Sequence, residues 1–133
     1  MPVNPDLQGR TLPPTAPVVV TAERIAAFAA AVGASDPGIA PPTFAIVVQQ
    51  AALDALLAEP DTGFEIRNVV HAEQRFAARR PVVAGDELTG TMTVTAVRTV
   101  GSNAMVSAET VIADASGETV TTATSTLLVG GES

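Results

Sequence analysis

The chain has 133 residues, no cysteine, and 14 acidic against 7 basic side chains, which gives a formal net charge of −7. This length corresponds to one domain, and a hydrophobic fraction of 47% argues against wholesale disorder. The acidic balance disfavours binding to nucleic acid or to an anionic membrane, and the lack of cysteine excludes disulfides and thiolate chemistry. No apolar run approaches the roughly 20 residues that span a bilayer, and none resembles a signal peptide, so we expect a cytoplasmic protein.

The first half of the chain predicts an irregular lead-in followed by two helices. Proline and glycine punctuate residues 1–16, which predicts a segment wrapped over the surface. Thr21 is a suitable N-cap for a helix over residues 22–32, and a glycine follows that can end it. A second helix is expected over about residues 43–58, with Thr43 as its N-cap. This second helix is apolar on nearly every side, so we expect it to be enclosed.

The second half of the chain predicts strands. Four runs rich in valine, threonine and isoleucine cover residues 64–78, 87–100, 103–113 and 118–129. Their alternation predicts an antiparallel sheet with one buried face, and the apolar helix is the element around which that sheet can curl. The pattern therefore predicts a single α+β domain over residues 1–133, a hot-dog fold in outline, with residues 130–133 as a tail.

Three segments carry a resemblance to a known family. They are G-R-T-L-P-P at 9–14 with the helix after it, A-P-P-T-F at 40–44, and V-V-H-A-E-Q-R-F at 69–76 continued by R-P-V-V-A-G-D-E-L. Their order and spacing resemble the FAS1-like or MaoC N-terminal dehydratase family, which includes non-catalytic subunits of actinobacterial (3R)-hydroxyacyl-ACP dehydratases. The resemblance implies a hot-dog fold and a role in acyl-thioester chemistry. Neither a cofactor nor a metal site is predicted.

Catalytic relatives in this family carry a G-D-x-N-P-x-H segment after the first helix. Its Asp and His handle the proton and the hydroxyl lost in dehydration. In this chain Ala34 stands at the Asp place and Asp36 at the Asn place, where it is interpreted as a turn residue. The His place falls near Gly38 or Ile39, neither of which transfers a proton. A stretch between this segment and A-P-P-T-F also appears in relatives and is missing here, so we predict no catalytic residue.

Several residues remain candidates for binding. The acyl channel is expected to be lined from the central helix, by Thr43, Phe44, Val47, Val48 and Ala51. The single histidine, His71, is a further substrate-binding candidate, although a structural or interface role is favoured. Glu73, two residues on, is expected to share its strand face and to pair with it. Arg75, Arg79 and Arg80 are candidates for receiving a phosphopantetheine arm or a carrier protein; the alternative is solvated strand-end charges.

Three functions follow from this pattern. The leading prediction is a non-catalytic subunit that forms a heterodimer with a catalytic MaoC-like hot-dog subunit. The pair would dehydrate (3R)-3-hydroxyacyl thioesters of an acyl carrier protein or of coenzyme A. The second is a homodimeric hot-dog protein that binds an acyl chain or a polyketide intermediate. The third is a thioesterase, for which only Asp54 or Glu59 offers a carboxylate on the central helix.

Overall fold

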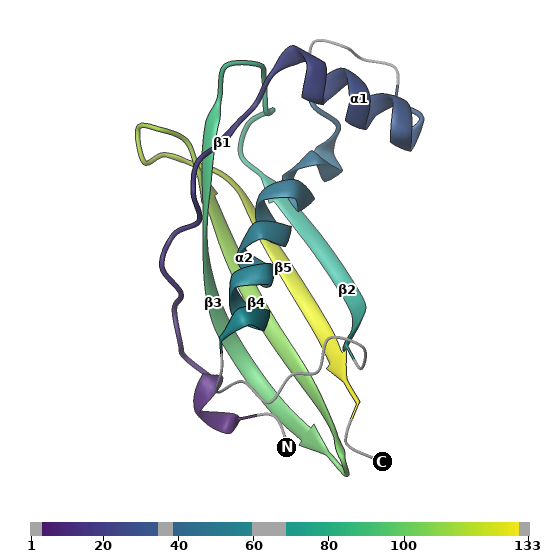
Figure 1. Ribbon diagram of the computed structural model, residues 1–133, viewed down its shortest axis with the longest axis vertical. Coiled ribbons are helices and arrows are strands. Elements are labelled where there is room, and N and C mark those ends of the chain that lie inside the picture. The colour runs from purple at the N-terminus through teal and green to yellow at the C-terminus, as the bar shows by residue number, and fades with distance from the viewer. Residues whose placement is uncertain (1–3, 35–38, 60–68, 131–133) are drawn as a thin grey trace.

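The computed structural model describes residues 4–34, 39–59 and 69–130, which form an antiparallel sheet and two α-helices (Figure 1). The strands lie in the order β1-β3-β4-β5-β2. Their bounds are β1 Val18–Val19, β2 Val69–Ala78, β3 Glu87–Val100, β4 Asn103–Ala113 and β5 Thr119–Val129. The helices are α1 Ala22–Val32 and α2 Ile46–Ala58, with 3₁₀ turns η1 at Pro5–Leu7 and η2 at Pro42–Ala45.

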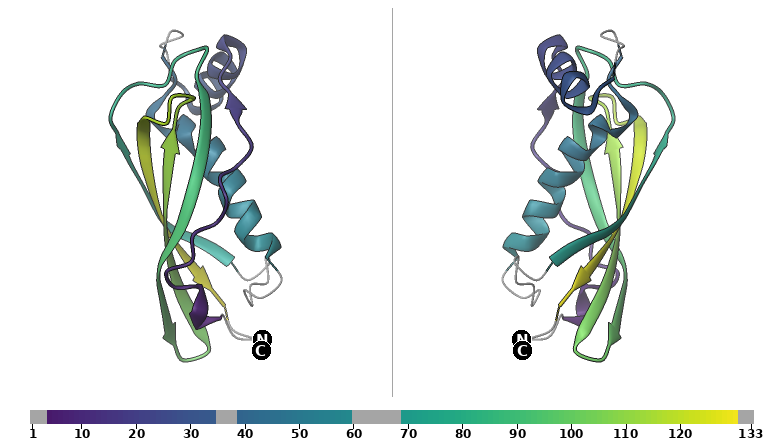
Figure 2. Two further views of the ribbon diagram at one scale, coloured as in Figure 1. Left: turned by 90° about the vertical axis from the view of Figure 1, so that its left-hand side faces the viewer. Right: turned by 90° about the vertical axis from the view of Figure 1, so that its right-hand side faces the viewer.

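The sheet has one covered face. Figure 2 shows α2 and the N-terminal segment against that face, while no described helix covers the other. Along β4 and β5, buried residues alternate with more exposed ones, as expected for a half-buried sheet. The α+β hot-dog prediction is therefore confirmed. Of the strand predicted over residues 64–78, the part from Val69 onward is confirmed, and residues 64–68 lie outside the described residues.

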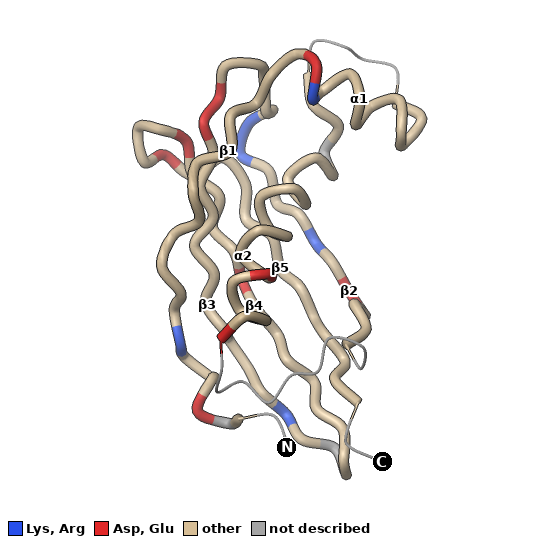
Figure 3. Tube along the Cα trace, in the orientation of Figure 1, with Lys and Arg blue, Asp and Glu red and all other residues tan. Residues whose placement is uncertain are grey.

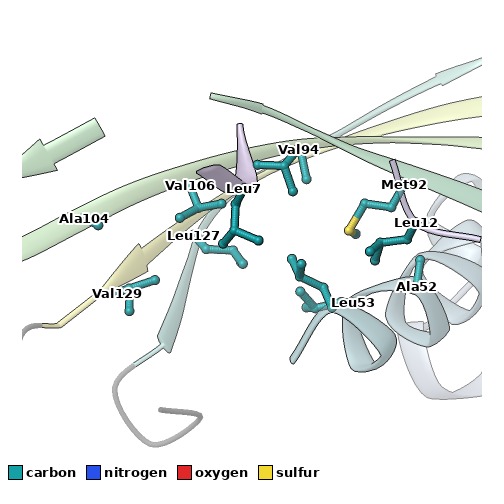
Figure 4. Packing of buried hydrophobic residues seen from close by; sticks show 12 residues of the cluster. Leu7, Leu12, Ala52, Leu53, Met92, Val94, Ala104, Val106, Leu127 and Val129 are labelled. Atoms are coloured by element: carbon teal, nitrogen blue, oxygen red, sulfur yellow. The ribbon is translucent and has the colours of Figure 1, made fainter. Parts of the chain in front are cut away.

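The N-terminal lead-in lies along β3 and contributes two leucines to the core. Backbone N–H groups of Gly9, Leu12 and Thr15 donate to carbonyl oxygens of β3 at 2.7–2.9 Å. The Leu7 and Leu12 side chains are buried in the cluster drawn in Figure 4. Most of the other described side chains of this segment are exposed, so the lead-in lies over the surface while its two leucines reach into the core.

The two helices begin in different ways. Thr21 caps α1 as predicted, accepting a hydrogen bond from the backbone N–H of Arg24 at 3.1 Å. Thr43 does not cap α2: it lies inside η2, and no side chain caps either element. Pro41 and Pro42 direct the chain into this 3₁₀ turn, since proline fixes φ and lacks the N–H that a cap would satisfy. The Phe28 ring of α1 packs edge-to-face on Phe44, with centroids 5.3 Å apart.

The central helix α2 is buried on one side only. Its sheet-facing residues are Val48, Gln49, Ala52, Leu53 and Leu56. Gln50 and Asp54 are exposed on the other side, where they bond to each other at 2.9 Å. Val47 and Ala51 are half-buried. Within the described chain the sheet therefore does not enclose α2, which leaves apolar side chains on the outward side of the helix.

Candidate functional site

A pocket of about 380 Å³ lies beside the start of α2. It is formed where the segment before α2, the end of β2 and the start of β5 come together, close to α1 at the upper end of Figure 1. The lining residues are Ile39, Ala40, Pro41, Ala45, Ala78, Arg79, Arg80, Pro81, Val82 and Thr121. Seven of these ten residues carry only hydrocarbon side chains, so the pocket suits an apolar ligand with few polar contacts.

The two places at which the sequence was expected to lack the acid–base pair, Ala34 and the surroundings of Ile39, follow α1 and precede α2. Gly33 ends α1 in the left-handed conformation with φ of 76°, and Ala34 follows, its N–H donating to the Ala29 carbonyl at 2.8 Å. Ile39, near the predicted His place, lines the pocket. Asp36 lies outside the described residues. The described lining contains neither a carboxylate nor an imidazole, so these residues can bind a ligand but supply no acid–base pair.

The predicted channel residues of the central helix lie around this pocket rather than in it. Phe44 and Val48 are buried, at 2% and 0% exposure, by the chain itself. Thr43 is exposed, and Val47 and Ala51 are half-buried on the outward side of α2. None of the five is among the lining residues, so their role in binding an acyl chain remains a prediction.

His71 belongs to a hydrogen-bonded group on the covered face of β2. Its Nε2 lies 2.7 Å from the side-chain oxygen of Gln74, which also accepts from the Ser125 hydroxyl at 2.6 Å. An amide oxygen only accepts, so Nε2 of His71 is the donor. Glu73 was predicted to share this face, and that was wrong: an irregularity between His71 and Glu73 shifts the register and turns Glu73 to the opposite face.

The three candidate arginines have different surroundings. Arg75 pairs with Glu73 at 2.5 Å on the exposed part of β2 and is not among the pocket-lining residues. Arg79 and Arg80 both line the pocket. Arg80 binds Asp86 through two nitrogens at 2.9 and 3.0 Å, and also Asp114 at 3.1 Å. The Arg79 side chain forms no ion pair with any described residue.

Arg80, Asp86 and Asp114 form a charged clamp between two chain turns. It joins the connection before β3 to the turn between β4 and β5, where Figure 3 shows acidic and basic segments close together. Hydrogen bonds from Ser116, and then from Arg80, lower the pKa of Asp114 to about 2. The hydrogen bonds from Arg80 also hold the pKa of Asp86 below its ordinary value.

The clamp gives a testable pH dependence of stability. A carboxylate whose folded-state pKa is depressed stabilises the fold above its unfolded pKa of about 3.9, and this contribution is lost as the pH falls toward the folded value. We therefore expect the urea concentration at the unfolding midpoint to decrease as the pH is lowered from about 4 to about 2. Asp114→Asn should make this fall shallower, whereas Arg98→Gln, which removes an exposed charge elsewhere, should leave it unchanged. Equal slopes for wild type and Asp114→Asn would contradict the clamp.

The described residues contain no group of three histidine, cysteine or acidic side chains placed to hold a metal ion. None of the described helices is both long enough and apolar enough to cross a bilayer.

Solved structures with the same architecture place the fold in a known class. The chain superposes on a chain of the HadBC (3R-hydroxyacyl-ACP dehydratase) complex of Mycobacterium tuberculosis with a TM-score of 0.77 at 27% identity. That match covers 92% of this chain and 97% of the other. HtdX of the same organism superposes with a TM-score of 0.79 at 18% identity, over 91% of this chain and 51% of that one, a likeness of fold alone. The chain thus has the hot-dog fold of MaoC-like dehydratases.

The family itself is shown by sequence. Residues 7–123 match the model described as "FAS1-like, dehydratase domain region", and the chain belongs to this family. A UPF0336 protein of Clavibacter michiganensis is 52% identical, and one of Leifsonia xyli is 49% identical; each alignment covers 99% of both chains. Both alignments span 147 positions whereas this chain has 133 residues, so at least 14 aligned positions have no counterpart here.

Proposed function

We propose that this chain is the non-catalytic subunit of a (3R)-3-hydroxyacyl-thioester dehydratase. It pairs with a MaoC-like hot-dog subunit that supplies the Asp and the His. Dehydration needs one group that removes the α-proton and another that protonates the leaving hydroxyl. The observation that carries the proposal is the pocket beside α2, whose described lining has Ile39 near the expected His and offers no acid–base group.

The unpaired parts of the fold support a partner. β2 is the last strand of the described sheet, 10 residues long, and pairs with β5 along one edge only. Val70 on this edge strand is 60% exposed, so the strand presents a large apolar side chain beside its charged pair Glu73–Arg75. The half-buried Ala51 of α2 offers further apolar surface. The similarity to a chain of the HadBC complex fits a subunit that works within an assembly.

The proposal is tested by activity with and without a partner. The full chain would be purified alone, and then mixed with a MaoC-like protein that carries the G-D-x-N-P-x-H segment. Hydration of crotonyl-CoA and of a longer 2-enoyl-CoA would be followed in each case. We expect the hydration rate of the mixture to exceed that of the lone chain by at least about 100-fold, the lower end of the range for general acid–base catalysis.

The control separates complex formation from mere addition of an active enzyme. The catalytic protein is assayed alone at the same concentration, and the mass of the mixture is measured by size-exclusion chromatography with light scattering. A 1:1 complex with activity above that of the catalytic protein alone supports the proposal. Robust hydration by the lone chain, or a stable homodimer that ignores the partner, would overturn it; the homodimer would favour a binding protein instead.

A further inference from the structure

His71 is the single histidine of the chain, and it lies on the covered face of the edge strand β2. It stands opposite Leu127 of β5, whose side chain is buried in the core. His71 itself is exposed, because β2 lies beside α2 and not beneath it (Figure 1). An irregularity in β2 follows directly after His71, and bulges at sheet edges often re-aim a side chain. A protein that extends the sheet past β2 would therefore meet this imidazole.

Hydrogen bonds within the chain fix the tautomer of His71. Its Nε2 lies 2.7 Å from Oε1 of Gln74, and this oxygen also accepts from the Ser125 hydroxyl at 2.6 Å. The amide nitrogen of Gln74 donates to the Arg75 carbonyl oxygen at 3.3 Å, which holds the amide in this orientation. A neutral imidazole carries one N–H, so with its proton on Nε2 the ring has an acceptor at Nδ1. Among the described residues, none donates to Nδ1. The chain thus presents an oriented acceptor at the edge of its sheet.

The described surroundings of this imidazole carry few charges. β5 and η2 pack against β2, and neither contains an ionisable side chain. Glu73 and Arg75 of β2 lie on the opposite face and pair with each other. On α2 the charged side chain is Asp54, which is exposed on the outward side, and Glu59 follows at the end of the helix. β2 and the two elements packed against it therefore offer no carboxylate that would stabilise a protonated His71.

We propose that His71 is a recognition contact for the catalytic subunit, in which Nδ1 accepts a hydrogen bond from an uncharged donor on that partner. The inference rests on the proposed function, which supplies the partner for the unpaired edge of β2. Protonation turns Nδ1 into a donor and places an unpaired positive charge in the interface, where burial is costly. Assembly therefore requires the neutral imidazole, and the complex weakens as the pH falls through the range in which histidines take up a proton.

The test measures the dissociation constant of the complex between the full chain and the MaoC-like protein. Biolayer interferometry with the partner immobilised would cover the range from about pH 7.5 to about pH 5.5, in which histidines ordinarily change charge. The partner has histidines of its own, so the readout is the difference between the wild type and His71→Asn. The asparagine oxygen stands near the place of Nδ1 and does not titrate. We expect the dissociation constant of the wild type to rise about 10-fold more than that of His71→Asn, as for one proton excluded from the interface.

His71→Gln separates the two ring nitrogens. The glutamine amide reaches the place of Nε2, so it can still donate to Gln74, but it offers no acceptor at the place of Nδ1. This variant should bind about 10-fold more weakly than the wild type at the upper pH, because the donor of the partner loses its acceptor. His71 is exposed, so neither substitution opens the core.

Gln74→Glu tests the charge state of the ring directly. The carboxylate keeps the acceptor for His71 and Ser125 and adds a negative charge that favours the protonated imidazole. The loss of binding should then begin about one pH unit higher than in the wild type. Gln8→Glu is the matched control, since the same charge is added on the lead-in, where the side-chain oxygen accepts from the N–H of Val97 at 3.1 Å. Its pH profile should equal that of the wild type.

The outcomes separate this contact from the proposed function. Equal pH profiles for the wild type and His71→Asn, or undiminished binding by His71→Gln, would reject the contact. If the 1:1 complex nevertheless forms and is active, the subunit role stands without it. The absence of a complex at every pH would reject both. A complex that depends on His71 in these ways, but that shows no more hydration than the catalytic protein alone, would support the contact and reject the dehydratase role.

Discussion

Leu12→Ala is expected to lower the free energy of unfolding by about 2–5 kcal/mol, the usual cost of truncating a buried leucine. The Leu12 side chain is 4% exposed and packs in the core cluster that also contains Ala52 of α2 and Met92 of β3 (Figure 4). Its backbone N–H also donates to the Met92 carbonyl at 2.8 Å. Truncation therefore leaves a cavity between the lead-in, the helix and the sheet. Urea unfolding followed by far-UV circular dichroism measures the loss.

The matched control is Leu128→Ala. Leu128 is 42% exposed on β5, so the same chemical change should cost less than about 1 kcal/mol. If the two variants lost the same stability, the lead-in would not be packed as described. A large difference would show that a proline-rich segment, which looks dispensable by composition, is a structural part of the domain.

Gly90→Val is expected to destabilise the fold by about 1–3 kcal/mol through overpacking. Gly90 lies on β3 beneath α2, where an added Cβ would stand 3.0 Å from a methyl of Val48 and 3.1 Å from a methyl of Thr110. The helix can approach the sheet this closely because the strand has no side chain at this position. Valine favours strands, so a loss of stability here would reflect the contact and not the backbone.

Two further variants isolate that contact. Thr91→Val alters the neighbouring position on the opposite face of β3 and should change stability by no more than about 0.5 kcal/mol. Val48→Ala in the Gly90→Val background removes the contacting methyl groups, so the double mutant should be more stable than the sum of the single effects predicts. Strict additivity would mean that α2 does not rest on Gly90.

Local sequence rules predicted most of the secondary structure. The Thr21 cap and the terminal Gly33 of α1 were confirmed, as were three strands to within one residue. These features depend on residues close together in the chain. The cap needs a side chain that reaches a nearby backbone N–H, and a strand shows an alternation with a period of two residues. Thr43 is the instructive failure: its residue type suits a cap, but the prolines before it set a different backbone path.

The candidate site was predicted in part. The lack of an acid–base pair at Ala34 and near Ile39 stays a prediction from the resemblance, and the structure places Ile39 at a pocket. Thr121 gave no signal in the sequence, because it is one of many threonines in the strands. Its distinction is a buried hydroxyl without a partner among the described residues, a property that depends on which strands meet there.

The sequence by itself determined the α+β composition of the domain and the strand and helix periods. The tertiary structure decided which side chains lie in contact with one another. It turned Glu73 away from His71 by one irregular step in β2, and it gave Arg80 two carboxylates while Arg79 has none among the described residues. The physical reason is that hydrogen bonds and ion pairs act over a few ångströms in space, between groups that may be more than 30 residues apart, as Arg80 and Asp114 are.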